Sequence, residues 1–236
     1  MIAFREIAKC FGKLDVLRGV NLAVQAGRVT AILGPNAAGK TTLIKLLLGL
    51  AFPDSGEILF DGAPLDANGA YRSRIGYMPQ IAHFPDNLTG AELLRVIDDL
   101  RPGCAPEDDL VFGFDLQREL EKPLRTLSGG TRQKLNAVIA FRFRPDLLIL
   151  DEPTAGLDPL SASVLKDRIV ADRALGKTVV ITSHVLSELD EIADDVAYLV
   201  DGTVQYSGPI GDLKQRTHEP TLERAIAKLM SARLVA

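Results

Sequence analysis

The chain has 236 residues, with 27 Lys and Arg against 31 Asp and Glu, and its formal net charge is -4. This length is enough to bury a sizeable core, and we expect two lobes. The weakly acidic balance provides no basic surface for nucleic acid, so no nucleic-acid partner is expected. Cys10 and Cys104 are too few for a disulfide framework and lack metal-ligand spacing, which indicates thiols in a reducing cytosol.

No stretch of the sequence has the pattern of a membrane span or a secretory signal. The N-terminus lacks a basic region followed by an apolar core and a small-residue cleavage site. The apolar stretch Leu43–Phe52 contains Lys45 and falls short of the ~20 residues that cross a bilayer. We therefore expect a cytoplasmic protein, and any membrane-spanning part must come from another chain.

The first part of the chain is predicted to form strands around one helix. The helix is expected over the apolar-periodic segment Leu43–Leu50, and the first two strands are expected to form an antiparallel edge sheet. The predicted strands are Ile2–Lys9, Val20–Val24, Val29–Leu33, Glu57–Asp61 and Arg74–Met78.

The apolar period changes from two to three or four between Pro85 and about Arg144, which predicts a mostly helical lobe. Thr89-Gly90-Ala91-Glu92 has the pattern of a capping box at the start of a helix. The all-apolar strand Leu147–Leu150 and the buried strand Val179–Thr182 then flank an amphipathic helix over Pro159–Leu175, which is typical of a parallel sheet. A hairpin and further helical segments follow.

Residues 34–42 carry a phosphate-binding pattern, G-x-x-x-x-G-K-[ST], between a predicted strand and a predicted helix. Backbone N–H groups of such a loop and the positive end of the helix replace the water that a triphosphate loses on binding. Lys40 is expected to reach the β- and γ-phosphates, and the Thr41 hydroxyl to ligate Mg²⁺. The loop residues are Gly34, Pro35, Asn36, Ala37, Ala38, Gly39, Lys40, Thr41 and Thr42.

A carboxylate pair, Asp151 and Glu152, follows the strand Leu147–Leu150. Open α/β sheets place their ligands at the carboxyl ends of such strands. Asp151 is suited to hold Mg²⁺, directly or through water, and Glu152 is suited to act as general base toward an attacking water. His184 follows the next strand; a lone histidine is commonly a packed or surface residue, but this position favours a function.

Ser128, Gly129 and Gly130 precede another predicted helix. Ser128 is a suitable N-cap, and the two glycines allow an anion to approach the helix N-terminus closely. The pattern fits a second phosphate site, and it fits a plain glycine-rich helix start equally well.

Phe11 lies between the first two predicted strands, where its ring is able either to stack on a base or simply to pack.

This set of motifs resembles that of the ATP-binding cassette (ABC) ATPases over residues 1–210. In the family's order and approximate spacing the chain has the phosphate loop, Gln80, the signature Leu127–Thr131, Asp151-Glu152, Gly156-Leu157-Asp158 and His184. The resemblance implies an α/β fold: a P-loop NTPase core with a mostly parallel sheet, an antiparallel β edge subdomain and an inserted α-helical lobe. The lobes expected are 1–84 with 145–208 for nucleotide binding, 85–144 as the helical signature lobe, and 209–236 as a short helical extension.

The resemblance also implies roles that local chemistry leaves open. Phe11 matches the aromatic residue that stacks on adenine, and His184 matches the switch histidine that contacts the γ-phosphate. Gln80 matches the catalytic loop glutamine that senses the γ-phosphate and the metal, and Asp158 matches an aspartate that crosses the dimer interface. Without the resemblance, Gln80 and Asp158 are better interpreted as solvated loop residues.

In this family the signature of one subunit covers the ATP bound by the other, so Ser128, Gly129 and Gly130 are expected to act in trans around two Mg-ATP. ATP then favours the closed head-to-tail dimer, and hydrolysis removes that preference. The implied partners are a second copy of the chain, or a related cassette, and an integral membrane subunit docked in a groove between the lobes. The implied location is the inner face of the cell membrane.

Two residues depart from the family pattern. Ala37 replaces a usual glycine, which is compatible with the loop if its φ is negative. Thr131 replaces the usual glutamine at the end of the signature and leaves the serine and both glycines intact. Neither change predicts an inactive site, because the phosphate-binding and catalytic residues are all present.

The subtype is indicated by two further resemblances. The ending around Thr221-Leu222-Glu223 is similar to that of cassettes that pair with exporter-type (ABC-2-like) membrane subunits. The stretch Ile75–Leu94 is similar to the cassette encoded with nitrous-oxide-reductase maturation genes and implicated in copper-site assembly. The alternative is a soluble mechanical ATPase acting on ribosomes or DNA, but such relatives usually have two cassettes or a coiled-coil insertion. A P-loop kinase or GTPase leaves the signature and His184 without a function.

Overall fold

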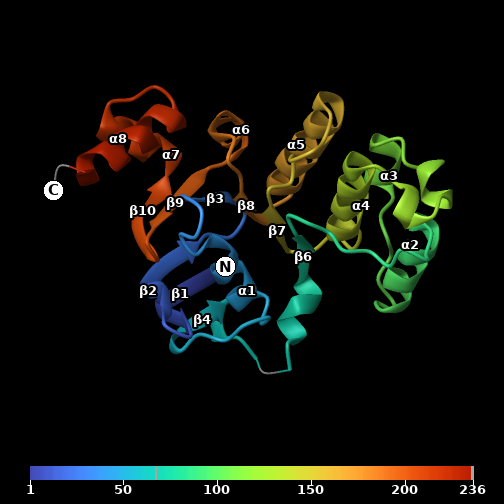
Figure 1. Cartoon of the computed structure of the whole chain (residues 1–236), viewed down its shortest axis with the longest axis horizontal. Helices are drawn as coiled ribbons and strands as arrows, with labels where there is room; N and C mark the ends of the chain where they lie inside the picture. The colour runs from blue at the N-terminus through green and yellow to red at the C-terminus, as the bar shows by residue number, and fades with distance from the viewer. Residues whose placement is uncertain (67, 235–236) are drawn as a thin grey trace.

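The computed structural model describes residues 1–66 and 68–234, which form two β-sheets with helices around them (Figure 1). The strands are β1 (Ile2–Phe11), β2 (Leu14–Val24), β3 (Val29–Leu33), β4 (Ser55–Phe60), β5 (Ala63–Pro64), β6 (Ile75–Met78), β7 (Leu147–Asp151), β8 (Thr178–Thr182), β9 (Asp195–Val200) and β10 (Thr203–Pro209). The α-helices are α1 (Lys40–Leu47), α2 (Gly90–Asp99), α3 (Asp109–Gly113), α4 (Gly129–Phe141), α5 (Pro159–Ala174), α6 (Leu186–Ile192), α7 (Ile210–Thr217) and α8 (Leu222–Leu234). Short 3₁₀ helices cover Ala70–Arg74 (η1), Glu119–Glu121 (η2) and Leu124–Thr126 (η3).

The larger sheet has the strand order β10-β9-β3-β8-β7-β6, and the smaller sheet has the order β2-β1-β4-β5. Strands β9, β3, β8, β7 and β6 are parallel to one another, and β10 is antiparallel to β9. All pairs in the smaller sheet are antiparallel. This architecture confirms the predicted P-loop NTPase fold class. Within the described part of the chain, none of the helices combines the length and hydropathy needed to cross a bilayer.

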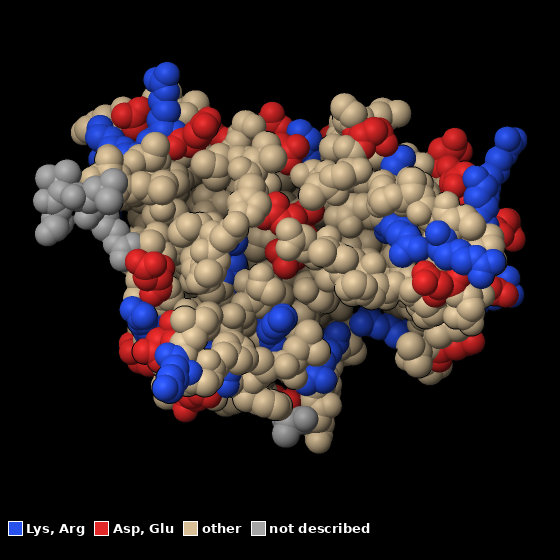
Figure 2. Space-filling model, in the orientation of Figure 1, with Lys and Arg blue, Asp and Glu red and all other residues tan. Residues whose placement is uncertain are grey.

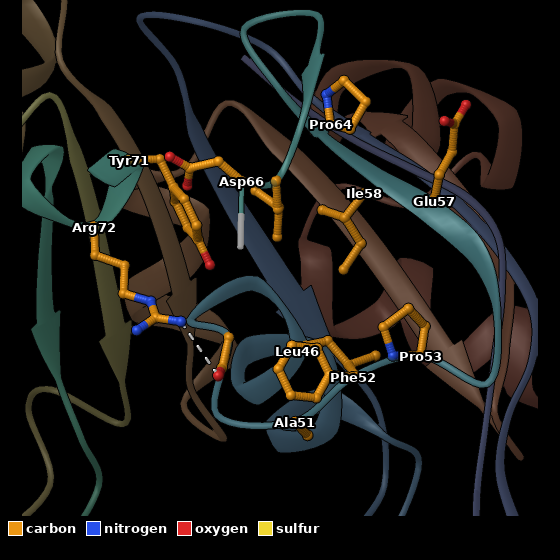
Figure 3. A pocket seen from close by; sticks show the side chains of 12 residues that line it. Leu46, Ala51, Phe52, Pro53, Glu57, Ile58, Pro64, Asp66, Tyr71 and Arg72 are labelled. Carbon is orange, nitrogen blue, oxygen red and sulfur yellow. Dashed lines mark hydrogen bonds between the residues drawn. The ribbon is translucent and has the colours of Figure 1, made fainter. Parts of the chain in front are cut away.

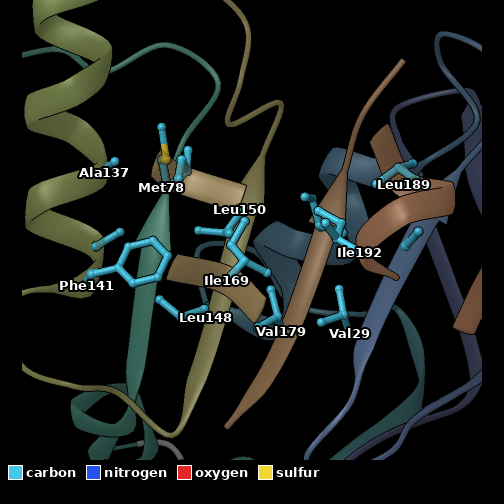
Figure 4. Packing of buried hydrophobic residues seen from close by; sticks show 14 of the residues in the cluster. Val29, Met78, Ala137, Phe141, Leu148, Leu150, Ile169, Val179, Leu189 and Ile192 are labelled. Carbon is cyan, nitrogen blue, oxygen red and sulfur yellow. The ribbon is translucent and has the colours of Figure 1, made fainter. Parts of the chain in front are cut away.

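Each parallel strand contributes side chains to two cores, one on each face of the larger sheet. In β7, Leu147 and Ile149 pack with α1 and the antiparallel sheet, whereas Leu148 and Leu150 pack against the helices of the opposite face. Figure 4 shows this second core, where Phe141 of α4 lies over the sheet. Burial on both faces explains why these strands are continuous apolar runs in the sequence.

Helices α2, α3 and α4 gather at the β6 end of the larger sheet (Figure 1). Thr89 and Glu92 form the predicted capping box at the start of α2. Helix α4 lies directly on β6, because a Cβ atom at Gly76 would stand only 2.0 Å from the backbone oxygen of Ala140. Glycine at this position therefore permits backbone contact between the helical lobe and the sheet.

The bounds of two elements differ from the predicted ones by three residues or more. Strand β2 begins at Leu14 instead of Val20, because it pairs with β1 as far as the hairpin end, where Phe11 faces Leu14. Helix α1 covers Lys40–Leu47 instead of Leu43–Leu50. Its polar first turn carries no apolar periodicity, and the helix ends before Gly49, whose φ is 66°.

Candidate functional site

The carboxyl ends of β3, β8 and β7 lie next to one another in the larger sheet, and each leads into a segment with predicted site residues. A pocket at this edge is lined by Asn36–Thr42, Gln80, Asp151-Glu152, His184 and two residues of β2. Figure 2 shows both signs of charge interspersed over the visible face, with acidic side chains near its centre over β7 and β8. The fold thus brings together segments that lie far apart in the sequence, from Leu14 to His184.

The phosphate loop wraps the amino end of α1. Gly39 has a φ of 104°, and a Cβ there would lie 2.5 Å from Leu17 Cδ2, so glycine is required. The first hydrogen bond of α1 runs from the Leu43 N–H to the Gly39 oxygen, which leaves the preceding amides directed out of the helix end. Such an end binds anions, because its amides and the helix dipole both favour negative charge.

Lys40 extends across this loop. Its Nζ donates hydrogen bonds to the backbone oxygens of Gly34 at 2.7 Å and Pro35 at 3.0 Å. Burial lowers the pKa of Lys40, and the nearby Glu152 and Asp151 carboxylates oppose that shift. The ammonium is thus positioned at the loop rim, facing the carboxylate pair across the pocket.

Ala37 corrects the expectation from the sequence. Its φ is 65°, in the left-handed region, so the negative φ that would make alanine compatible with the loop is not present. An L-residue with a Cβ atom pays roughly 1–2 kcal/mol for this conformation, which glycine avoids. Because Ala37 is exposed, its methyl group gains little packing in return. The loop keeps its shape with a strained residue at its tip.

Asp151 and Glu152 are both buried and are fixed by the neighbouring strand β8. The Thr182 hydroxyl donates to Asp151 Oδ1 at 2.5 Å, and Glu152 N–H donates to the same hydroxyl oxygen at 3.1 Å. The Glu152 carboxylate meets His184 twice: Oε1 lies 3.1 Å from Nε2, and Oε2 accepts from the His184 N–H at 3.3 Å. Carboxylate and imidazole therefore form one unit on the pocket wall.

Three oxygen-bearing side chains suited to a magnesium ion line the same pocket: Thr41, Gln80 and Asp151. Over residues 1–66 and 68–234, the structure has no cluster of three or more His, Cys, Asp or Glu that would hold a metal by itself. One carboxylate with a hydroxyl and an amide nevertheless fits Mg²⁺, which commonly takes its remaining ligands from phosphates and water. The donor set therefore fits a metal that binds together with a nucleotide.

The signature residues lie at a different place, the amino end of α4. Ser128 caps this helix by accepting from the Thr131 N–H at 3.1 Å, and the two hydroxyl oxygens lie 2.8 Å apart. The Thr131 side chain therefore contacts the cap residue directly. Ser128 and Gly129 are exposed and do not line the phosphate-loop pocket.

Asp158 is the N-cap of α5 rather than a free loop residue. It accepts from the Ser161 N–H at 2.9 Å and hydroxyl at 2.6 Å, and it pairs with Lys134 of α4 at 3.0 Å. The Ser161 hydrogen bonds, with Lys134, hold the pKa of Asp158 well below its usual range. Asp158 thus joins α5 to the helix that begins with the signature.

A family model described as "ABC transporter" matches residues 17–155, more than half of the chain. The chain belongs to the ABC transporter family. As an ABC protein it is similar to Nod factor export ATP-binding protein I of Burkholderia lata, with 35% identity over 85% of this chain and 68% of that protein. It is also 33% identical to bacitracin transport ATP-binding protein BcrA of Enterococcus faecalis, over 94% and 73% of the two chains.

Among solved structures, this ABC ATPase is similar to one described as the ATP-binding subunit of an ABC transporter. The TM-score is 0.89 and the identity 29%, with 98% of this chain and 99% of the other covered. Together with the family match, this similarity identifies the protein as an ATP-binding and ATP-hydrolysing subunit of the ABC type.

The aromatic residue expected to stack on adenine lies outside the pocket lining of this ABC ATPase. Phe11 ends β1 with 51% of its surface exposed, and Lys9 Nζ lies 5.3 Å from its ring centroid. Its role stays a prediction. Leu14 and Val16, which the motifs do not single out, line the pocket next to the phosphate loop. The apolar alternation of these two residues was the available signal that β2 begins there.

Proposed function

We propose that this ABC ATPase forms a head-to-tail dimer around two Mg-ATP and drives a separate integral membrane subunit of an exporter. One observation carries the proposal: Ser128 and Gly129 are exposed at the start of α4 and lie outside the pocket of their own phosphate loop. A second anion-binding helix end of this kind has a use when another copy, or a related cassette, brings its nucleotide to it.

Within each composite site the chain's own residues have distinct tasks. Lys40 and the loop amides bind the phosphates, and Glu152 takes a proton from the attacking water. His184 holds the Glu152 carboxylate in position through its N–H and Nε2. Thr41, Gln80 and Asp151 would hold Mg²⁺, which neutralises phosphate charge when bound.

The membrane subunit is proposed because relatives are named for Nod factor export and bacitracin transport. The ATPase would then lie at the inner face of the cell membrane. The membrane subunit would dock in a groove between the nucleotide-binding lobe, residues 1–84 and 145–208, and the helical lobe, residues 85–144. In this proposal the chain consists of these two lobes and a C-terminal extension over residues 209–236. The copper-site assembly role stays a prediction, since the relatives above are named for other cargo.

An apolar pocket on the nucleotide-binding lobe adds to this docking surface (Figure 3). Phe52, which follows α1 and is 74% exposed, and Ile58 of β4 line it opposite Tyr71. Arg72 reaches across its edge and donates to the backbone oxygen of Gly49 at 3.4 Å. An exposed aromatic residue at an apolar pocket is suited to contact a partner chain.

The mass of Glu152→Gln in solution tests the dimer. Loss of the general base should leave ATP bound but not hydrolysed, so light scattering should show a shift from monomer to dimer with Mg-ATP only. Lys40→Ala in the same background is the matched control, because it binds ATP more weakly and should stay monomeric at ATP concentrations that dimerise the parent. A monomer under all conditions would refute self-association of this chain.

Mixing two defective variants tests the trans arrangement. A Cβ at Gly129 meets no atom of its own chain within 4 Å, so Gly129→Glu should fold normally and block only a nucleotide from the partner. Lys40→Ala and Gly129→Glu should each be inactive, and their mixture should recover part of the ATPase rate. A mixture that recovers no ATPase activity would contradict the composite site.

Co-purification from detergent extracts tests the membrane partner. Salt-sensitive nucleic-acid binding with soluble partners would favour the mechanical ATPase instead.

A further inference from the structure

Two buried amide side chains on α4 have no part in the site described so far. Gln133 and Asn136 are 7% and 2% exposed, and they lie three residues apart, hence on one face of the helix. Buried amides are costly unless they form hydrogen bonds, so their partners show what the fold gains from them.

The partners belong to the two segments that carry the proposed catalytic residues. Gln133 Nε2 donates to the backbone oxygens of Glu152 at 3.4 Å and Pro153 at 3.3 Å. Asn136 Nδ2 donates to the backbone oxygen of Pro79 at 2.8 Å and to Gln133 Oε1 at 3.4 Å. The hydrogen bonds therefore form a chain from Pro79, the residue before Gln80, through α4, to the turn at Glu152 and Pro153, which we call the catalytic turn.

The catalytic turn is a segment whose backbone needs such support. Glu152 has a φ of 53°, a left-handed conformation that is costly for a residue with a side chain. Its N–H is held by Thr182, and its carbonyl oxygen accepts from Gln133 and from the Ala155 N–H at 3.2 Å. The two bonds together fix the peptide groups on both sides of the Glu152 Cα atom, and so fix the direction of its carboxylate.

Helix α4 also begins with the signature. Gln133 stands five residues after Ser128, roughly 7.5 Å along the axis at 1.5 Å per residue. The same first turns touch the loop after Glu152: a Cβ at Gly130 would lie 3.0 Å from the Gly156 oxygen, and Lys134 pairs with Asp158. A shift of α4 at its signature end therefore pulls on the catalytic turn through these contacts.

We infer that Gln133 and Asn136 are positioning residues for ATP hydrolysis. They couple the position of α4, which begins with the signature, to the orientation of Glu152 and to the segment that carries Gln80. The inference rests on the proposed trans dimer, in which α4 is pressed by the partner's nucleotide. Neither amide touches the nucleotide in this arrangement, so they act through the backbone of Pro79, Glu152 and Pro153.

Gln133→Met tests the role, because methionine keeps the length and volume and removes the donor. We expect kcat to fall about tenfold or more, with KM for ATP changed less than about twofold, because phosphate binding is untouched. The exposed Gln117→Met is the matched control and should leave both unchanged. In the Glu152→Gln background, Gln133→Met should still dimerise with Mg-ATP. Asn136→Leu is the second variant, with the same pattern expected if Gln133→Met folds poorly.

A double-mutant cycle separates positioning from mere stability. Gly129→Ala adds a methyl group that meets nothing in its own chain, so it clashes with no part of its own fold and alters the surface that faces the partner's nucleotide. Any gain in stability from the alanine is measured separately as the unfolding temperature. If Gln133 transmits the displacement of the signature to Glu152, the kcat of the double variant Gly129→Ala with Gln133→Met should be no lower than that of the slower single variant. An unchanged kcat in Gln133→Met, a loss that follows the unfolding temperature, or fully multiplicative effects would overturn the inference. A parent Glu152→Gln protein that never dimerises would instead refute the proposed dimer.

Discussion

Replacing Ala37 by glycine should stabilise the protein, against the usual effect of adding glycine. The φ of 65° at Ala37 costs an L-residue roughly 1–2 kcal/mol, and glycine removes that cost. Glycine also raises the conformational entropy of the unfolded chain, which offsets about 0.4–1 kcal/mol of this stabilisation. The exposed methyl group contributes little packing, so a net gain of about 0.5–1 kcal/mol remains. In a chain of this size, that is a rise of roughly 1–4 °C in the unfolding temperature.

Thermal unfolding followed by circular dichroism, without nucleotide, measures this change. The neighbouring Ala38→Gly is the matched control, because Ala38 is 2% exposed and is not among the residues with positive φ. It should lose about 1–2 kcal/mol from the added chain entropy and the deleted buried methyl group. If both variants lower the unfolding temperature equally, the reasoning from loop strain is wrong.

Three further predictions follow from the site and the surface. Lys40→Ala should weaken ATP binding at least about tenfold by removing the charge beside the phosphates, measured with a fluorescent ATP analogue. Asp158 has a pKa depressed below its ordinary 3.8, so its stabilisation is present above that pH and is lost as the pH falls further; Asp158→Asn should flatten acid unfolding below about pH 4. Phe52→Glu should reduce co-purification with the membrane subunit and spare basal ATPase activity, whereas Leu175→Glu, at a similarly exposed position, should leave both unchanged.

The fold was predictable where burial imposes a pattern. Strands β3, β7 and β8 are buried on both faces, so most of their residues are apolar. The phosphate loop has a fixed spacing of glycine, lysine and threonine. The capping box of α2 is equally local, because both of its hydrogen bonds lie within four residues. Such features need no knowledge of the tertiary structure.

The rest depends on contacts that no local pattern records. The start of β2 is set by pairing with β1, and the sign of φ at Ala37 is set by closure of the loop around α1. The hydrogen bonds of Gln133 and Asn136 reach 19 to 57 residues along the chain, so spacing alone cannot reveal them. Positions of this kind are identified only when separate segments meet in space.

The contact at Gly76 limits how the spacing between α4 and β6 can vary. At Gly76 the helix backbone and the strand backbone already touch, and no side chain remains to be removed. Every substitution there can only push the signature-bearing helix away from the strand that leads to Gln80. The distance between α4 and β6 is thus already at its minimum, so any substitution at Gly76 can only increase it and loosen the packing of the helix on the sheet.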